Sequence, residues 1–300
     1  KPVAVGKAAP WQLLRWSKEG GLIVLRSVTG RAEETSPDWV NASVVVATFP
    51  LKIRSDGAYS VNVTNLFRKG YPSGWGVGEA EDRVALRFET PKVFPKNVVL
   101  TLAATSRTAE EAPLRWNFVR LPSIRMEVRK LNPNSAFMHP GFMEMWPFSD
   151  IENDQKEVVR RWRIHSPGQS VDSTHQTSSI RIYLAPSMPT RWRSWVKAGA
   201  ESWNEAFSSA GLGAPVEVVD ASLIEGWDYD DIRNSALCWG RADACGWNIF
   251  DPRTGEILQA QIHSTNGVLP NLLARYIISM AAVDHRAKEG VLSEEFLGSF

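Results

Sequence analysis

The sequence of 300 residues predicts an α+β protein, and two observations carry this prediction. Residues 1–125 hold short runs rich in Val, Ile, Leu and Phe between turn-forming residues, which is typical of antiparallel strands. After residue 177 the pattern changes to strand, helix, strand. We therefore expect a β-rich domain over residues 1–125, a connecting region over 126–176 and a second domain over 177–300.

The N-terminal strands are predicted from apolar runs bounded by polar or glycine-containing loops. Regular spacing of this kind favours an antiparallel sandwich or a barrel-like sheet. The six runs are residues 20–28, 42–53, 58–67, 82–90, 97–105 and 114–122.

The second domain begins with a strand over 178–186, in which Ile180, Ile182 and Leu184 alternate with polar residues. A helix over 191–211 follows, with Thr190 as its cap and Gly211 or Gly213 as its end. Its apolar stripe is predicted to bury Trp192, Trp195, Val196, Gly199, Trp203, Ala206, Phe207 and Ala210 against a sheet. A strand over 215–220 completes a βαβ unit with parallel strands.

Composition and charge exclude some partners. Lys and Arg number 34 and Asp and Glu number 33, so the formal net charge is +1. Such a balance offers no electrostatic attraction for nucleic acid or for an anionic membrane surface. No run reaches the roughly 20 apolar residues of a membrane span. We expect no nucleic acid partner and no membrane span.

The 13 tryptophans leave two interpretations open. They could line a sugar-binding face, or they could fill the core, where Trp buries a large area. Because they are scattered and lie beside core-patterned residues, core packing is favoured.

Two cysteines and two sequons bear on the compartment. Cys238 and Cys245 suit either a cross-strand disulfide that closes a hairpin or two buried thiols. Asn41-Ala42-Ser43 and Asn62-Val63-Thr64 are glycosylation sequons. We expect an exported protein, whether extracellular, periplasmic or at the cell surface.

Spacing alone reveals no complete active site. No two of the five histidines lie four apart on a helix, so the sequence has no zinc-binding H-E-x-x-H pair. No G-x-S-x-G elbow, phosphate-binding loop or C-x-x-C pair is present either. The histidines are His139, His165, His175, His263 and His285.

Several stretches resemble a known family. They are "IRIYLAPSMPTRWRSWVKAGAESWNEAFSSAGL", "YDDIRNSALCW", "DPRTGEILQAQI" and "AVDHRA", with weaker landmarks upstream in "VFPKNVVLTL", "LPSIRMEVR" and "RRWRI". On these residues the chain resembles the N-terminal portion of bacterial zinc-dependent metalloproteases of the metzincin type that carry the domains DUF5117 and DUF5118. The likeness covers most of the chain, loosely at the N-terminus and well from residue 180 onward.

The resemblance implies that residues 177–300 form the upper, N-terminal subdomain of a metzincin-like protease. In that family a helix with H-E-x-x-H follows the region matching "LSEEFLGSF", where Ser293 is predicted to cap a helix. The motif is absent from this sequence. We therefore expect zinc and peptide hydrolysis for the full-length enzyme, and neither bound catalytic zinc nor activity for this chain alone. A second chain carrying the missing catalytic half is an expected partner.

The resemblance also implies a peptide or protein substrate that pairs with an edge strand of the sheet. The corner 251–258, "DPRTGEIL", lies just before a helical run over 267–282 and would deliver this strand, with residues 256–264 as its backbone. The substrate-binding residues would be Leu258, Gln259, Ala260, Gln261, Ile262 and His263. Two alternatives remain, namely a solvated hairpin corner at 251–258 and a non-catalytic binding or scaffold protein built on a protease-derived fold.

Overall fold

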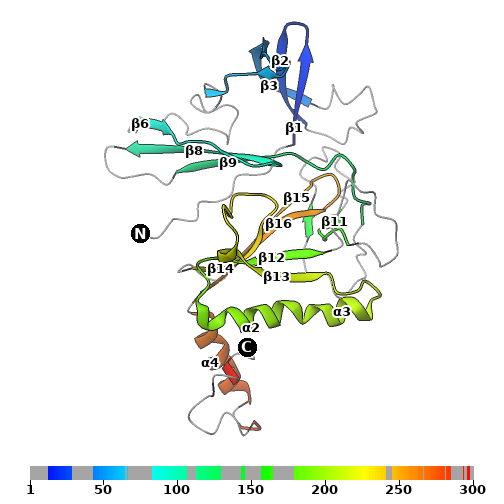
Figure 1. Cartoon of the computed structure of the whole chain (residues 1–300), viewed down its shortest axis with the longest axis vertical. Coiled ribbons are helices and arrows are strands. Elements are labelled where there is room, and N and C mark those ends of the chain that lie inside the picture. The colour runs from blue at the N-terminus through cyan, green and yellow to red at the C-terminus, as the bar shows by residue number, and fades with distance from the viewer. Residues whose placement is uncertain are drawn as a thin grey trace.

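A computed structural model shows mixed α and β content, which confirms the α+β class (Figure 1). It describes residues 13–28, 43–64, 66, 83–106, 113–129, 143–145, 157–164, 179–240, 245–265, 267–280, 282–284, 293 and 296–297. Three of the predicted features lie outside these residues: the sequon at Asn41, the histidines other than His263, and the segment 241–244 between the cysteines.

Two antiparallel sheets form the N-terminal part. The first contains β1 (Leu14–Glu19), β2 (Leu22–Val28) and β3 (Ser43–Pro50), in that order. In the second, β8 (Asn97–Ser106) pairs with β6 (Arg83–Phe88), β7 (Lys92–Val93) and β9 (Leu114–Val119). A two-stranded ladder joins β4 (Lys52–Ile53) and β5 (Tyr59–Ser60). Five of the six predicted strand runs are confirmed, and β1 is an additional strand outside them.

The one predicted run that is not confirmed is 58–67. It is wrong as a single strand because pairing in β5 stops at Ser60. The reason lies in the sequon. The Asn62 side-chain oxygen accepts a hydrogen bond of 3.0 Å from the Thr64 backbone N–H, which turns the chain locally. Such an Asx turn competes with the strand ladder for backbone groups.

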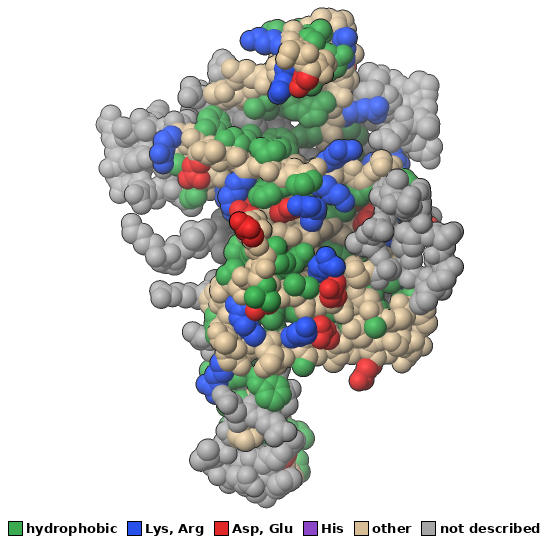
Figure 2. Space-filling view, in the orientation of Figure 1, with side chains coloured by type: hydrophobic (Ala, Val, Ile, Leu, Met, Phe, Trp, Pro, Cys, Tyr) green, Lys and Arg blue, Asp and Glu red, His purple; other side chains and the backbone are tan. Residues whose placement is uncertain are grey.

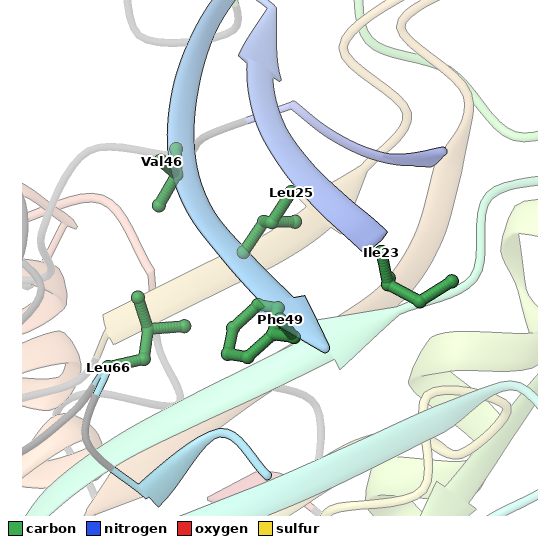
Figure 3. Close-up of a cluster of buried hydrophobic side chains, with 5 residues drawn as sticks. All are labelled: Ile23, Leu25, Val46, Phe49 and Leu66. Atoms are coloured by element: carbon green, nitrogen blue, oxygen red, sulfur yellow. The ribbon is translucent and has the colours of Figure 1, made fainter. Parts of the chain in front are cut away.

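The two N-terminal sheets share one core. Its buried residues are Ile23, Leu25, Val46, Phe49 and Leu66 (Figure 3). Leu100 and Trp116 from the second sheet pack against these side chains, so the two sheets face each other. Of the two predicted arrangements, an antiparallel sandwich and a barrel-like sheet, two separate sheets with a shared core favour the sandwich.

A five-stranded mixed sheet forms the C-terminal part, with the strand order β13-β12-β14-β16-β15. Neighbours are parallel except for β15, which runs antiparallel to β16. The strands are β12 (Ile180–Leu184), β13 (Val216–Asp220), β14 (Ser235–Gly240), β15 (Cys245–Phe250) and β16 (Ile257–Thr265). Other elements among the described residues are β10 (Met143–Met145), β11 (Glu157–Val159), η3 (Ala221–Leu223) and α4 (Val268–Met280).

The predicted βαβ unit is confirmed, since β12 and β13 are parallel and are joined by α2 (Thr190–Glu201) and α3 (Trp203–Ser209). The prediction of Thr190 as the helix cap is wrong: the N-cap is Pro189, which has no side-chain cap hydrogen bond, and Thr190 is the first helical residue. The chain leaves α3 through Gly211 at a φ of +75°, as its predicted role as a helix stop requires.

The predicted apolar stripe is wrong at Gly199, Trp203, Ala206 and Ala210, which are exposed, Trp203 by 65%. Val196, Ala200 and Phe207 make the contacts with the sheet. Ser202 separates α2 from α3, although its backbone angles stay helical and its N–H donates to Ala198 O.

The two halves of the protein meet at the segment 228–234. On one side the Asn97 side chain of β8 donates to Asp230 O (2.7 Å) and accepts from Ile232 N (3.0 Å). On the other side Gln259 of β16 donates to three carbonyls of this segment at 2.8–3.0 Å. Segment 228–234 therefore fixes the N-terminal sheets to the centre of the C-terminal sheet.

Ionic contacts surround this joint. Lys92 Nζ lies 2.6 Å from Asp228 Oδ2 and 2.8 Å from Asp230 Oδ2, and Arg115 also pairs with Asp230. Figure 2 shows basic and acidic side chains close together where the upper sheets meet the lower one. Burial alone would raise the pKa of Asp230, but the hydrogen bonds from Arg115 and Lys92 outweigh it and hold that pKa below its ordinary value.

Within the described residues, no helix is both long and apolar enough to cross a membrane. The most apolar helix is α4, whose 13 residues include a single charge, Arg275. It confirms the helical run predicted after the corner.

Candidate functional site: an open sheet edge

The strand predicted to be the edge is in the interior of the sheet. β16 contains all six predicted substrate-binding residues, and it pairs with β14 on one side and with β15 on the other. Its main-chain groups are therefore used by two neighbours, and a peptide cannot add to it. The prediction that residues 256–264 form the edge, with Leu258, Gln259, Ala260, Gln261, Ile262 and His263 aligning a substrate, is wrong.

The edge itself is β15, Cys245–Phe250, which ends the strand order of the sheet. No strand in the described part of the chain pairs with its outer side. An unpaired edge offers a row of N–H and C=O groups to an extended chain. The candidate site is thus one strand away from its predicted position.

The outward groups of β15 can be assigned from the ladder. Ala260 of β16 lies opposite Asn248, yet the Ala260 N–H donates to Ser235 Oγ on β14 at 3.0 Å. Ala260 therefore turns its main chain away from β15. In an antiparallel pair, residues that exchange no hydrogen bonds point their backbone groups outward. Asn248 accordingly presents its N–H and C=O to the open side, as does Gly246 two residues earlier.

Arg160, which directly follows β11, holds one face of this edge strand. Its Nη1 donates to Asn248 Oδ1 at 3.2 Å, and its guanidinium carbon lies 4.5 Å from the centre of the Phe250 ring. Asn248 and Phe250 are two residues apart and so lie on the same face of the strand. A cation above an aromatic ring stabilises the strand by about 0.5–2 kcal/mol, depending on its exposure.

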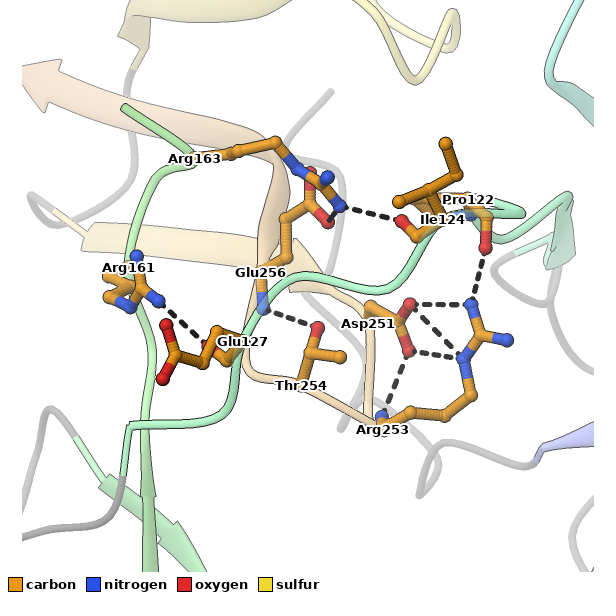
Figure 4. Close-up of polar contacts among 9 residues, drawn as sticks. All are labelled: Pro122, Ile124, Glu127, Arg161, Arg163, Asp251, Arg253, Thr254 and Glu256. Atoms are coloured by element: carbon orange, nitrogen blue, oxygen red, sulfur yellow. Dashed lines mark hydrogen bonds and ion pairs between the residues drawn. The ribbon is translucent and has the colours of Figure 1, made fainter. Parts of the chain in front are cut away.

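The corner 251–256 joins β15 to β16 as a hairpin connection (Figure 4). Its side chains Asp251, Thr254 and Glu256 are buried rather than solvated. Asp251 is fully buried, and its carboxylate accepts hydrogen bonds from the backbone and the guanidinium of Arg253. Arg253 also donates to Pro122 O at 2.7 Å. Gly255 has a φ of +76°, which favours glycine. The solvated-corner alternative is therefore wrong as well.

The connecting region completes this corner. Arg161 N donates to Gly255 O at 3.0 Å and Arg161 O accepts from Ile257 N at 2.9 Å, which forms a parallel bridge beside Glu256. Arg163 pairs with the Glu256 carboxylate (Figure 4). The position of β15 thus depends on residues 160–163, nearly 90 residues earlier in the chain.

The two cysteines are not within bonding distance. Cys238 and Cys245 both have His263 as their register partner, one from β14 and the other from β15. Two strand spacings separate their Cα atoms by about 10 Å, whereas a disulfide needs less than about 7 Å. Cys238 is a free, buried thiol, and burial raises its pKa to about 11. The disulfide alternative is excluded by the insertion of β16.

The described residues contain no group of three His, Cys, Asp or Glu side chains that could hold a metal ion. His263 lies in β16, and burial lowers its pKa.

The predicted cap near the end of the sequence is confirmed. Ser293 Oγ accepts a hydrogen bond of 3.1 Å from Phe296 N, the geometry of a helix N-cap.

Sequence reasoning misses three residues of the candidate site, namely Gly246, Asn248 and Arg160. A signal for β15 exists, because the turn at 251–255 requires a strand before it as well as after it. No local pattern reveals Arg160, whose contacts with β15 span about 90 residues of sequence.

In comparisons with known proteins, no family model, no curated protein and no solved structure matches the chain.

Proposed function

We propose that this chain is the sheet-bearing part of a zinc-dependent metallopeptidase of the metzincin type, and that its edge strand β15 aligns an extended peptide substrate. The observation that carries the proposal is the outward main chain of β15 at Asn248. Strand addition recognises a peptide through its backbone, which every peptide substrate possesses.

The hydrolytic groups of the proposed enzyme belong to another segment or chain, because H-E-x-x-H is absent from this sequence. In the proposed full-length enzyme, the two His of H-E-x-x-H would hold a zinc ion that polarises a water molecule, and the Glu of the motif would act as the general base for attack on the peptide bond. The residues of this chain would bind and orient the substrate. A second chain or segment that brings this motif, and an exported location, belong to the same proposal.

Contacts at the end and on one face of β15 support its assignment as the site. The fully buried Asp251 and the Arg160 contacts hold both the end and one face of the strand in place. A rigid strand loses little conformational entropy when a peptide pairs with it. The sequence landmarks that resemble the protease family include the corner that ends β15.

The test is binding of peptides from a casein digest to the 300-residue chain, followed by amide hydrogen exchange. We expect peptides to slow exchange at Asn248 and Gly246. The variant Asn248→Pro removes the outward N–H while sparing the bonds to β16, since edge strands tolerate proline on their solvent side. It should lose the binding.

Asn248→Ala is the matched control, because it keeps the backbone donor and removes only the side chain. The proposal fails if casein peptides bind without protecting β15, if they do not bind at all, or if Asn248→Pro binds them as well as the parent chain does.

A binding or scaffold protein that holds a partner along the same strand is the alternative. The open edge of β15 favours the protease and the scaffold equally. The two functions differ in whether the bound peptide is cleaved. Attachment of a segment that contains H-E-x-x-H should produce chelator-sensitive cleavage of casein if the protease proposal holds. A stable complex without cleavage favours the scaffold.

A further inference from the structure

The other edge of the five-stranded sheet, β13, has the same open position in the strand order. Ile180 N of β12 donates to Pro215 O at 2.6 Å, so Pro215 points toward β12. Backbone direction alternates along a strand, and Val216 and Val218 therefore point their N–H and C=O groups outward. These four groups could pair with another strand.

All four groups are instead bound by side chains of the crossover helices. Asn204 accepts from Val216 N at 2.8 Å and donates to Val216 O at 2.9 Å. Glu201 accepts from Val218 N and Lys197 donates to Val218 O, both at 3.1 Å. The Asn204 amide satisfies a donor and an acceptor of one residue, as a neighbouring strand would do.

The spacing of these helix residues explains how they reach one edge. Lys197, Glu201 and Asn204 follow one another at intervals of four and three residues, which places them along one side of a helix. Lys197 and Glu201 also form an ion pair at 3.6 Å. Beneath this row Val216 and Val218 are 8% and 3% exposed.

We infer that Asn204, with Glu201 and Lys197, acts as a surrogate strand that closes the β13 edge against strand addition and leaves β15 as the strand-accepting edge of this sheet. The partner excluded is a second copy of this chain or a peptide. A sheet with two open edges can pair head to tail without closing, and such contacts lead to fibres.

The inference rests on the proposed function only in treating β15 as the accepting edge. Closure of β13 is testable by itself. In the parent chain, hydrogen exchange at the Val216 and Val218 amides should be much slower than at Asn248. Equal exchange at these three positions would overturn the inference without any variant.

The decisive variants are Asn204→Ala, which empties the space beside Val216, and Asn204→Asp, which keeps the acceptor but turns a second oxygen toward Val216 O. Each should expose the edge. We expect each variant to associate with increasing concentration in sedimentation velocity, or to bind a second equivalent of casein peptide. Adding Asn248→Pro should abolish association if β13 pairs with β15.

Glu205→Ala is the control, because Glu205 lies on the same helix, is exposed and makes none of the hydrogen bonds described for β13. It should behave as the parent. Variants at Asn204 that fold cooperatively, stay in the parent's oligomeric state and bind no further peptide would contradict the inference. Absence of peptide binding in the parent, together with association of Asn204→Ala, would instead reject the proposed function and keep the closed edge.

Discussion

Arg163 and Glu256 form a bidentate ion pair, with Nε–Oε1 and Nη2–Oε2 distances of 2.8 and 2.5 Å, and each side chain is only 11% exposed. The pair joins the connecting region to the residue directly before β16, and Arg163 also donates to Ile124 O at 2.8 Å. Three segments distant in sequence are thus held by one guanidinium.

The first prediction concerns this pair. Glu256→Gln leaves the Arg163 charge buried without its carboxylate, and loss of one partner of a buried pair costs about 3–5 kcal/mol. Urea denaturation should show a lower free energy of unfolding. The double variant Arg163→Met with Glu256→Met should recover much of the loss, because it buries no unpaired charge. Equal stability of Glu256→Gln and the parent would refute the buried-pair interpretation.

The second prediction concerns the corner glycine. Gly255→Ala places a Cβ at a φ of +76° and should lower the free energy of unfolding by about 1–2 kcal/mol. Gly246→Ala is the matched control in β15, since its added Cβ would meet Ile262 Cγ1 at an ordinary 3.9 Å. It should change stability by less than about 0.5 kcal/mol. Thermal unfolding of the two variants distinguishes strain at the corner from a general intolerance of alanine.

The third prediction concerns Asn97, which is 3% exposed. Asn97→Ala leaves the buried Ile232 N–H without its acceptor, at a cost of about 1–3 kcal/mol. Exchange of amides in segment 228–234 should accelerate. Asn117 is exposed and contacts only the Asn97 amide among these groups, so Asn117→Ala should have the smaller effect.

The fourth prediction is a pH dependence at the same joint. The pKa of Asp230 is lowered in the folded protein, so its contribution to stability is present above the unfolded pKa of about 3.9 and is lost as the pH falls further. Burial would lower the pKa of Lys92, but its hydrogen bonds to Asp228 and Asp230 outweigh this effect and raise that pKa. The contribution of Lys92 is therefore lost only as the pH rises above about 10.4.

The free energy of unfolding, measured from pH 7 downward, should therefore decrease below about pH 4. This decrease should be smaller in Asp230→Asn than in the parent chain. Lys92 is 48% exposed, and the share of this pair should be no more than about 1 kcal/mol. An unchanged acid profile in Asp230→Asn would show that other carboxylates govern the transition.

The fifth prediction concerns the thiol. With a pKa of about 11 and 2% exposure, Cys238 should resist iodoacetamide at pH 8 in the folded chain and react after denaturation. Mass spectrometry of peptides containing Cys238 measures the extent of this labelling. Rapid labelling in the native state would mean that β14 opens readily.

The sequence predicts the local elements of this fold well, and long-range order explains the errors. Alternation at Ile180, Ile182 and Leu184 and the stop at Gly211 determine β12 and the helix end by local physics. The order of strands in a sheet depends on contacts between distant segments, which local patterns do not encode. The prediction of an edge at residues 256–264 fails because it overlooks the strand 245–250 before them.

The candidate site shows the same limit. Turn chemistry identifies the corner at 251–258, but the burial of that corner depends on Pro122 O, Arg161 and Arg163. These deciding partners lie outside the window that a periodicity argument considers.

The insertion of β16 between β14 and β15 constrains the order of assembly. β14 and β15 are neighbours along the chain, yet neither is the other's partner. β14 can pair with β12, which is made before it, but its other side and the whole of β15 must wait for a strand that the ribosome makes after them. During synthesis the sheet can be completed only when residue 265 has emerged, so β15 spends that interval without its partner strand and β14 with one side unpaired. Slow translation there would prolong exposure of a segment that is prone to aggregate.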